Sequence, residues 1–274
     1  MSNPNVKSEK AASSGSFNRL FASILIPVAL VIGVVVYKFI LGSTSNFVDG
    51  NPDGHPLPGN YLGMMYKGGL MVPVLMASMI IVISVIIERV VSLGVASGKG
   101  PTAVFVRKIK GFLDRNDING AIKECDTQKG SVGNVIREGL HKYNAMSTMQ
   151  GLEKEQKILA IQKEIEEATS LELPMLEKNL VILATFASVA TLMGLLGTVL
   201  GMIRAFSAIA TAGAPDAVAL STGISEALIN TALGIGTSAM AIISYNYFTT
   251  KIDGLTYGID EAGFSIAQSF AAKH

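Results

Sequence analysis

The sequence has little cysteine and few charged residues. It contains 274 residues but only one cysteine, Cys125, so no disulfide can form within the chain and a disulfide scaffold is excluded. Only 16% of the residues are charged and 49% are hydrophobic, whereas ordinary soluble domains carry about 25% charged residues. Disorder over most of the chain is also excluded, because disordered segments combine low hydrophobicity with high charge.

An excess of charge of one sign and clusters of histidine are lacking as well. The formal net charge is +1, which argues against a nucleic-acid-binding protein. His55, His141 and His274 are scattered without the spacing of metal ligands. The glycine-rich stretches lie inside apolar runs and not between a strand and a helix, where phosphate-binding loops occur. We therefore expect no metal, no cofactor and no enzymatic activity, and we interpret Cys125 as a buried, inert thiol.

Four long apolar runs are present, each long enough to cross a hydrocarbon core of about 30 Å. They cover residues 20–41, 68–87, 180–212 and 218–248. The first is longer than the apolar region of a signal peptide and no A-x-A cleavage site follows it, so we interpret it as an uncleaved anchor. The predicted fold class is an all-α integral membrane protein with four transmembrane helices. Two of these helices are long and extend into a helical cytoplasmic domain.

The distribution of Lys and Arg predicts how these spans are oriented. Basic residues are frequent in residues 1–19, in residues 99–178 and in the C-terminal tail, whereas the loop 42–67 has only Lys67. Both termini are therefore predicted on the cytoplasmic side. The predicted segments are a cytoplasmic tail (1–18), an extra transmembrane helix (19–41), a periplasmic loop (42–67), a transmembrane helix (68–93), a cytoplasmic helical domain (94–178), a transmembrane helix (179–212), a periplasmic turn (213–217), a transmembrane helix (218–250) and a cytoplasmic C-terminal helix or tail (251–274).

The segment 94–178 is predicted to be helical throughout. Its amphipathic stretches are 102–113, a helix capped by Asp117 or Asn119 and running through Cys125, then 132–142 and 152–173. The last carries mixed charges spaced for i,i+4 pairs, and we expect Pro174 to kink it without ending it. A helix from 179 to 211 would be about 50 Å long, more than a bilayer needs, so we expect the third span to continue into the helix before it.

Small residues and hydroxyls recur at helical spacing in the third and fourth spans. Gly194, Gly197, Gly201 and Gly234 are typical of positions where membrane helices pack closely. Thr198 and Thr231 admit two interpretations. Each hydroxyl could bond its own helix backbone, or a face of hydroxyls could line a narrow wet path.

Arg204 and Glu226 are charged residues inside these two spans. Each lies about eight to ten residues from the turn that joins the spans, so their depths are similar. Because a charge at mid-membrane costs at least about 2.5 kcal/mol, an ion pair between them is expected. We favour an architectural clamp over proton carriage by Glu226. The first two apolar runs contain no acidic residue before Glu88. If the protein moves protons, a partner would therefore have to bring the carboxylate that exchanges them.

Two motifs carry a resemblance to a known family. The stretches LLGTVLGMIRAF at 195–206 and GISEALINTALG at 223–234, followed by Tyr245 and Asn246, resemble the MotA/TolQ/ExbB proton-channel family, most closely ExbB and TolQ. The resemblance covers about residues 68–250 and is strongest over 192–246.

The resemblance implies a pentamer in the bacterial inner membrane around a dimer of a single-span ExbD/TolR-like partner with a membrane aspartate. Proton flow would drive work across the periplasm, such as TonB-dependent import through a TonB-like protein. By position, Thr198 and Thr231 match the family's pore threonines, and Glu226 matches a pore-lining or structural glutamate.

Three features depart from the family pattern, namely the extra first span, Arg204 and Met240. They leave the ion open between H⁺ and Na⁺. The alternative function is a passive membrane scaffold without ion conduction, in which valine would be tolerated at Thr198 and Thr231.

Overall fold

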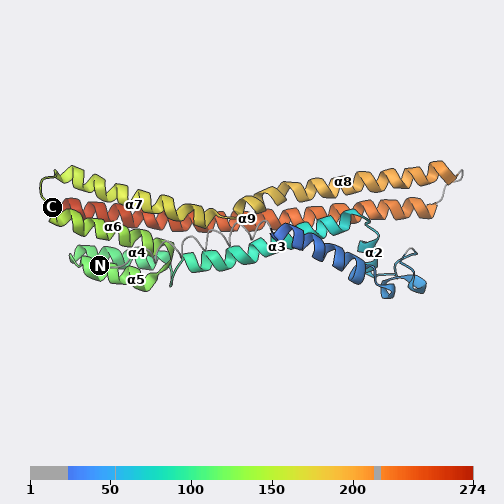
Figure 1. Cartoon of the computed structure of the whole chain (residues 1–274), viewed down its shortest axis with the longest axis horizontal. Coiled ribbons are helices and arrows are strands. Elements are labelled where there is room, and N and C mark those ends of the chain that lie inside the picture. The colour runs from blue at the N-terminus through green and yellow to red at the C-terminus, as the bar shows by residue number, and fades with distance from the viewer. Residues whose placement is uncertain (1–23, 53, 213–216, 274) are drawn as a thin grey trace. The chain divides into compact units, whose positions relative to one another are not determined.

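The computed structural model describes residues 24–52, 54–212 and 217–273, and within these ranges it is helical apart from its loops (Figure 1). Two compact units share the chain. The first comprises Met1–Val85 and Ile182–Ile243, and the second comprises Ile86–Val181 and Ser244–His274. The predicted N-terminal tail and the turn residues 213–216 lie outside the described residues.

The helices confirm the all-α fold class. Four of them are long and apolar enough to cross a membrane, and the only strand-like pairing in the described residues is one isolated bridge between Phe47 and Pro56. The chain is a multi-pass membrane protein. Its helices are the first apolar helix Ile24–Leu41, α2 Tyr61–Tyr66, α3 Met71–Ala96, α4 Thr102–Asp114, α5 Ile118–Gln128, α6 Gly130–Thr148, α7 Lys154–Glu177, α8 Leu180–Ala212 and α9 Ala217–Lys273.

In the first unit, the first apolar helix packs closely against α3. A Cβ atom on Gly33 would lie 2.6 Å from the carbonyl oxygen of Pro73, so the two backbones touch there. The last turns of the helix, Val36–Leu41, are π-helical. There the Tyr37 ring stacks on Tyr66 with centroids 4.7 Å apart, and its hydroxyl donates to the Tyr66 carbonyl at 3.1 Å. The extra span is therefore an integral part of this unit.

The loop after the first helix is ordered by two asparagines. The buried Asn46 amide donates to the carbonyls of Ile40 and Leu41, at 2.8 and 3.0 Å. These are carbonyls that the end of a helix leaves without a partner. Asn60 donates to Asn46 Oδ1 at 3.1 Å and accepts from the first backbone N–H groups of α2. The loop therefore has a defined path from the first helix to α3.

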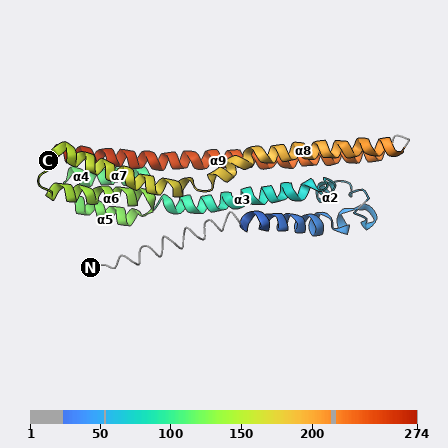
Figure 2. The same cartoon turned by 45° about the horizontal axis from the view of Figure 1, so that its top comes forward.

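The second unit is a bundle of α4 to α7 with the C-terminal part of α9, as both views show (Figures 1 and 2). Its core includes an edge-to-face contact between Tyr143 and Phe270, with centroids 4.9 Å apart. The expected cap of α5 forms at Asp117, which accepts from the Gly120 N–H at 2.8 Å. Cys125 is buried in this unit, and burial raises the pKa of its thiol to about 12. At neutral pH the thiol is therefore protonated and a poor nucleophile.

Several helices differ in their bounds from their predictions. The second membrane helix, predicted over 68–93, covers Met71–Ala96, and α6 covers Gly130–Thr148, beyond the predicted 132–142. Pro174 lies inside α7, as predicted, and only Lys178 and Asn179 separate α7 from α8. The C-terminal segment continues α9 without a break to Lys273.

The junction of α7 and α8 is held by charged side chains of α3. Arg89 is 1% exposed and donates to the carbonyl of Leu176 at 3.0 Å, in the last turn of α7. The Glu88 carboxylate accepts from Arg89 at 2.7 Å and from the Asn179 amide at 3.1 Å. Asn179 has φ of +62°, a left-handed conformation that ends a helix. This cluster therefore provides hydrogen-bond and ionic partners for the polar groups at the break between α7 and α8. In the sequence, Glu88 and Arg89 had marked only the end of a span.

Candidate functional site at the α8–α9 seam

The candidate site lies in the first unit, where α8 and the N-terminal part of α9 run side by side (Figures 1 and 2). Glycines bring the two backbones into contact. A Cβ on Gly234 would lie 2.6 Å from the Ala190 carbonyl oxygen, and a Cβ on Gly194 would lie 2.9 Å from that of Asn230. At Gly197 and Gly201 the nearest α9 atoms would be 2.6 and 3.2 Å from the added Cβ. All four predicted packing glycines therefore face this seam.

Thr198 and Thr231 are hydrogen-bonded to each other across the seam. Thr198 Oγ1 also lies 3.2 Å from the Gly194 carbonyl and 3.5 Å from the Ala227 carbonyl, and Thr231 Oγ1 lies 3.5 Å from the same Gly194 oxygen. A hydroxyl has one proton to donate and two lone pairs that accept. The pair can therefore bond in either direction, with the second proton going to a backbone carbonyl.

Other hydroxyls of α9 bond differently. Thr237 donates to its own helix, to the Leu233 carbonyl at 2.9 Å, and Ser238 bonds across the seam to the Ala187 carbonyl. Neither of them pairs with another hydroxyl in the contacts above. Thr198 thus bonds both to the carbonyl of its own helix, at Gly194, and to Thr231, whereas Thr237 bonds within its helix. Whether the hydroxyl pair lines a wet path stays a prediction.

Asn230 is a site residue that sequence reasoning did not single out. It is 1% exposed, and its amide nitrogen donates to the Gly68 carbonyl at 2.9 Å. Its Oδ1 has no hydrogen-bond partner among the described residues. An asparagine inside an apolar run was the available signal in the sequence, because a buried amide is usually hydrogen-bonded and so indicates a polar partner. Asn230 ties the turn before α3 to the middle of the α9 span.

Arg204 and Glu226 form an ion pair within one chain. The Glu226 side chain is 14% exposed and that of Arg204 is 49% exposed. Gly69 lies against the pair, because an added Cβ would lie 3.0 Å from Arg204 Nη1 and closer still to the carboxylate. Gly69 also has φ of +70°, which favours glycine. Arg204 follows Thr198 by six positions, which places the ion pair about 9 Å along α8 from the hydroxyl pair.

We expect the double substitution Arg204→Met with Glu226→Gln to be less disruptive than Arg204→Met alone. The single change leaves a carboxylate inside a span without its partner, which is costly. Thermal unfolding of the four forms in detergent gives a double-mutant cycle, and a coupling of about 0.5–3 kcal/mol is expected for contacting residues. If the effects of Arg204→Met and Glu226→Gln on stability were simply additive, the ion pair would not stabilise the fold.

The described residues do not bring three His, Cys, Asp or Glu side chains together as a metal site. The site therefore consists of a hydroxyl pair, an ion pair and a buried amide on glycine-packed helices. Of these groups, the two hydroxyls can both donate and accept a hydrogen bond, whereas the guanidinium only donates. The unpaired carboxylate that a proton carrier needs is not among the groups at the seam, since Glu226 is bonded to Arg204.

Comparison with known proteins finds relatives over this part of the chain. Residues 128–261 match the MotA/TolQ/ExbB proton channel family, a range that includes both motifs of the seam. The chain is similar to the Tol-Pal system protein TolQ of Pseudomonas aeruginosa, with 31% identity over 124 residues, 45% of this chain and 54% of the relative. It is also similar to the biopolymer transport protein ExbB of Helicobacter pylori, with 42% identity over 81 residues, 30% of this chain and 56% of the relative.

A third relative is TolQ of Haemophilus influenzae, with 38% identity over 98 residues, 34% of this chain and 43% of the relative. The chain thus spans about half of the length of the curated relatives that it matches. The first apolar helix and the loop after it lie outside the family match.

Proposed function

Residues 128–261 belong to the MotA/TolQ/ExbB proton channel family, close to ExbB and TolQ, and from this premise we propose that the chain is the channel subunit of an ion-driven membrane motor. In this proposal the chain forms a pentamer in the bacterial inner membrane, with both termini in the cytoplasm. It couples the proton motive force to work across the periplasm, such as TonB-dependent import. The family is a channel family and not a known class of enzyme.

The paired hydroxyls of Thr198 and Thr231 are the observation that carries the proposal. They meet between two membrane helices, with backbone carbonyls as further acceptors. Two hydroxyls that can exchange donor and acceptor roles suit a site where a carboxylic acid gives up and regains a proton. In the proposed complex that acid is the membrane aspartate of a single-span ExbD/TolR-like partner dimer.

The structure of this chain supports the need for such a partner. Glu226 is bonded to Arg204, and the first two spans contain no acidic residue before Glu88. The carboxylate of Glu226 already has the Arg204 guanidinium as its ion-pair partner. We therefore assign Glu226 and Arg204 a structural role beside the pathway. The exchanging proton is assigned to the partner's carboxylic acid, with Thr198 and Thr231 as the hydroxyls that hydrogen-bond to that acid.

The native mass of the complex tests the proposal. The chain is expressed together with its genomic neighbours, extracted gently and weighed by native mass spectrometry. We expect a pentamer that carries two copies of a small single-span protein with an aspartate in its span. A homo-oligomer without such a partner, obtained with the neighbouring genes intact, would instead support a passive scaffold.

A further inference from the structure

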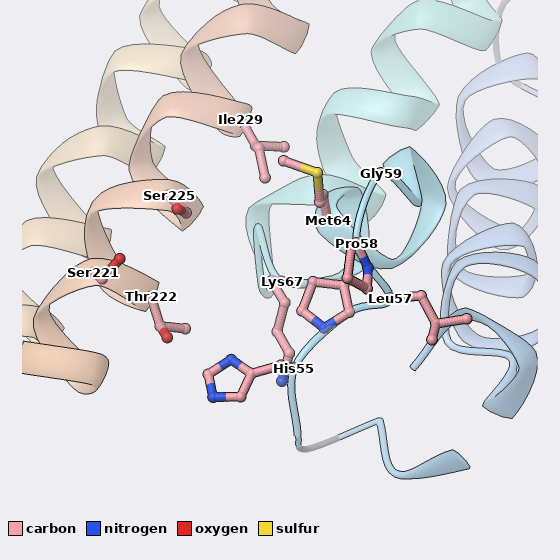
Figure 3. A pocket seen from close by; sticks show the side chains of 11 residues that line it. His55, Leu57, Pro58, Gly59, Met64, Lys67, Ser221, Thr222, Ser225 and Ile229 are labelled. Atoms are coloured by element: carbon pink, nitrogen blue, oxygen red, sulfur yellow. The ribbon is translucent and has the colours of Figure 1, made fainter. Parts of the chain in front are cut away.

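A cavity of about 480 Å³ lies in the first unit, between the loop 42–67 and the first turns of α9. Its volume is within the range of about 300–1,000 Å³ found for sites that bind small molecules. The loop and the helix face each other across the hollow in Figure 3. The lining residues that matter here are His55, Leu57, Met64, Lys67, Ser225 and Ile229.

The polar groups of this cavity suit an anion. Lys67 and His55 lie on the loop side, and Ser221 and Ser225 lie on the facing side of α9 (Figure 3). The two serines are four residues apart, hence on one face of the helix, and both are exposed. Ammonium, imidazole N–H and hydroxyl groups all donate hydrogen bonds. None of the residues that line the cavity is acidic.

The charged groups next to the cavity include Lys67 and the Arg204–Glu226 pair. Glu226 follows Ser225 in the chain, but its carboxylate is bonded to Arg204 at the seam. Lys67 also interacts electrostatically with Glu226, and its Nζ lies 5.8 Å from the ring centroid of Phe47. The sequence of the same loop also contains Asp49 and Asp53. Among the described residues that line the cavity, Lys67 is the charged side chain.

The position of the cavity at a bilayer surface favours an anion that also has an apolar part. The loop joins two helices that can span a membrane, Ile24–Leu41 and Met71–Ala96, so it lies at a bilayer surface. The facing residues belong to another candidate span, Leu220–Lys273. Leu57, Met64 and Ile229 add an apolar wall. A ligand with both an anionic head and an apolar chain matches this combination.

We propose that the cavity binds the phosphodiester headgroup of an anionic phospholipid. Lys67 and His55 contact the phosphate, and Ser221 and Ser225 donate to its oxygens. The first methylene groups of an acyl chain pack against Leu57 and Ile229.

The loop side of this site lies outside the family match, whereas its α9 side, with Ser221, Ser225 and Ile229, lies inside it. His55, Leu57 and Lys67 precede residue 128, where that match begins. The bound lipid would hold the loop against α9, close to the Arg204–Glu226 pair. The proposal rests on the fold of the first unit and not on ion transport, so the two can fail separately.

The absence of tryptophan from the chain allows a direct test. A Leu57→Trp variant of the full chain places one fluorophore on the cavity wall, and a Val31→Trp variant places it on the first helix, where Val31 is 63% exposed. Each variant is reconstituted in phosphatidylcholine vesicles that contain brominated phosphatidylglycerol or brominated phosphatidylcholine. We expect brominated phosphatidylglycerol to quench the Leu57→Trp fluorescence about fivefold more effectively than brominated phosphatidylcholine. This ratio corresponds to the contribution of one lysine near an anionic surface, at about fivefold. At Val31→Trp both lipids should quench equally.

Variants that remove one basic side chain identify the residues responsible for the preference for phosphatidylglycerol. In the Leu57→Trp background, Lys67→Gln should abolish the preference and His55→Gln should weaken it. The matched control Lys38→Gln, an exposed lysine on the first helix that does not line the cavity, should leave it unchanged. Equal quenching by both lipids at Leu57→Trp would overturn the proposal, and so would an equal loss with Lys38→Gln. Inorganic phosphate that removes the preference would indicate a free-anion site and would overturn the lipid assignment.

Discussion

Replacing Thr198 or Thr231 with valine is expected to reduce ion transport by at least about tenfold, which corresponds to about 1.4 kcal/mol of barrier. Valine keeps the shape of threonine and removes only the hydroxyl. The structure makes each hydroxyl the partner of the other, so either substitution breaks the pair. Stability should fall by only about 1 kcal/mol, the usual net contribution of one hydrogen bond. The measurement is proton uptake by vesicles that contain the co-expressed complex, under an imposed gradient.

Thr237→Val is the matched control for this experiment. It makes the same change on the same helix, but the Thr237 hydroxyl bonds only to the Leu233 carbonyl of its own helix in the described contacts. We expect near-normal transport for this variant and for Thr198→Ser, which keeps a hydroxyl. Full transport by a Thr198→Val, Thr231→Val double variant would remove the hydroxyl pair from the pathway and favour the scaffold function.

Gly234→Ala is expected to have the largest effect on folding and assembly. The added Cβ would lie 2.6 Å from the Ala190 carbonyl oxygen and 2.8 Å from Gly194 Cα, and both are backbone atoms of α8. Neither atom can move unless α8 moves away from α9. Overpacking of this kind costs about 1–3 kcal/mol. Moving α8 would also separate Thr198 from Thr231, which lies one turn before Gly234.

Gly236→Ala provides the comparison, because nothing lies within 4 Å of its added Cβ. This variant should melt at the same temperature as the parent or slightly above it, since alanine forms helices better than glycine. Gly201→Ala, with its nearest contacts at 3.2 Å, should be intermediate. Thermal unfolding of the detergent-extracted oligomer measures all three. Equal melting temperatures for Gly234→Ala and Gly236→Ala would contradict a seam set by backbone contact.

The two predictions concern one physical arrangement. Glycines permit the backbones of α8 and α9 to touch, and this approach is what brings two short threonine side chains within hydrogen-bonding distance. A seam wide enough for side chains on both helices would leave each hydroxyl to its own carbonyl, as at Thr237. Transport should therefore fail in Gly234→Ala even in the fraction of molecules that assemble.

Patterns within a segment were sufficient to predict the elements of the fold. Apolar runs longer than a bilayer needs identified the four membrane helices, because a span must satisfy its backbone internally and remain apolar. Asp117 was readable as a cap because its side chain acts within one turn. Helix ends were less predictable, since neighbouring segments contribute to stopping a helix. At Asn179 that contribution comes from Glu88.

Some residues of the candidate site could be identified from the sequence and others only from the structure. Thr198, Thr231, Arg204 and Glu226 could be found in the sequence because a hydroxyl or a charge inside an apolar run is conspicuous. Asn230 could not be assigned a role, because its partner Gly68 is 162 residues away in the chain. The same holds for the approach of Gly69 to the ion pair and for the bond from Arg89 to Leu176.

The sequence by itself thus determined the helices, the number of spans and the polar groups that they carry, because these depend on spacing and hydropathy along the chain. The sequence also predicted the pair of Arg204 and Glu226. The tertiary structure alone decided which other groups meet: threonine with threonine, Gly69 with the ion pair, and Lys67 and His55 across a cavity from two serines of α9. Helical periodicity specifies the face on which a residue lies but not the distant segment that packs there. Close packing of the folded chain makes that choice.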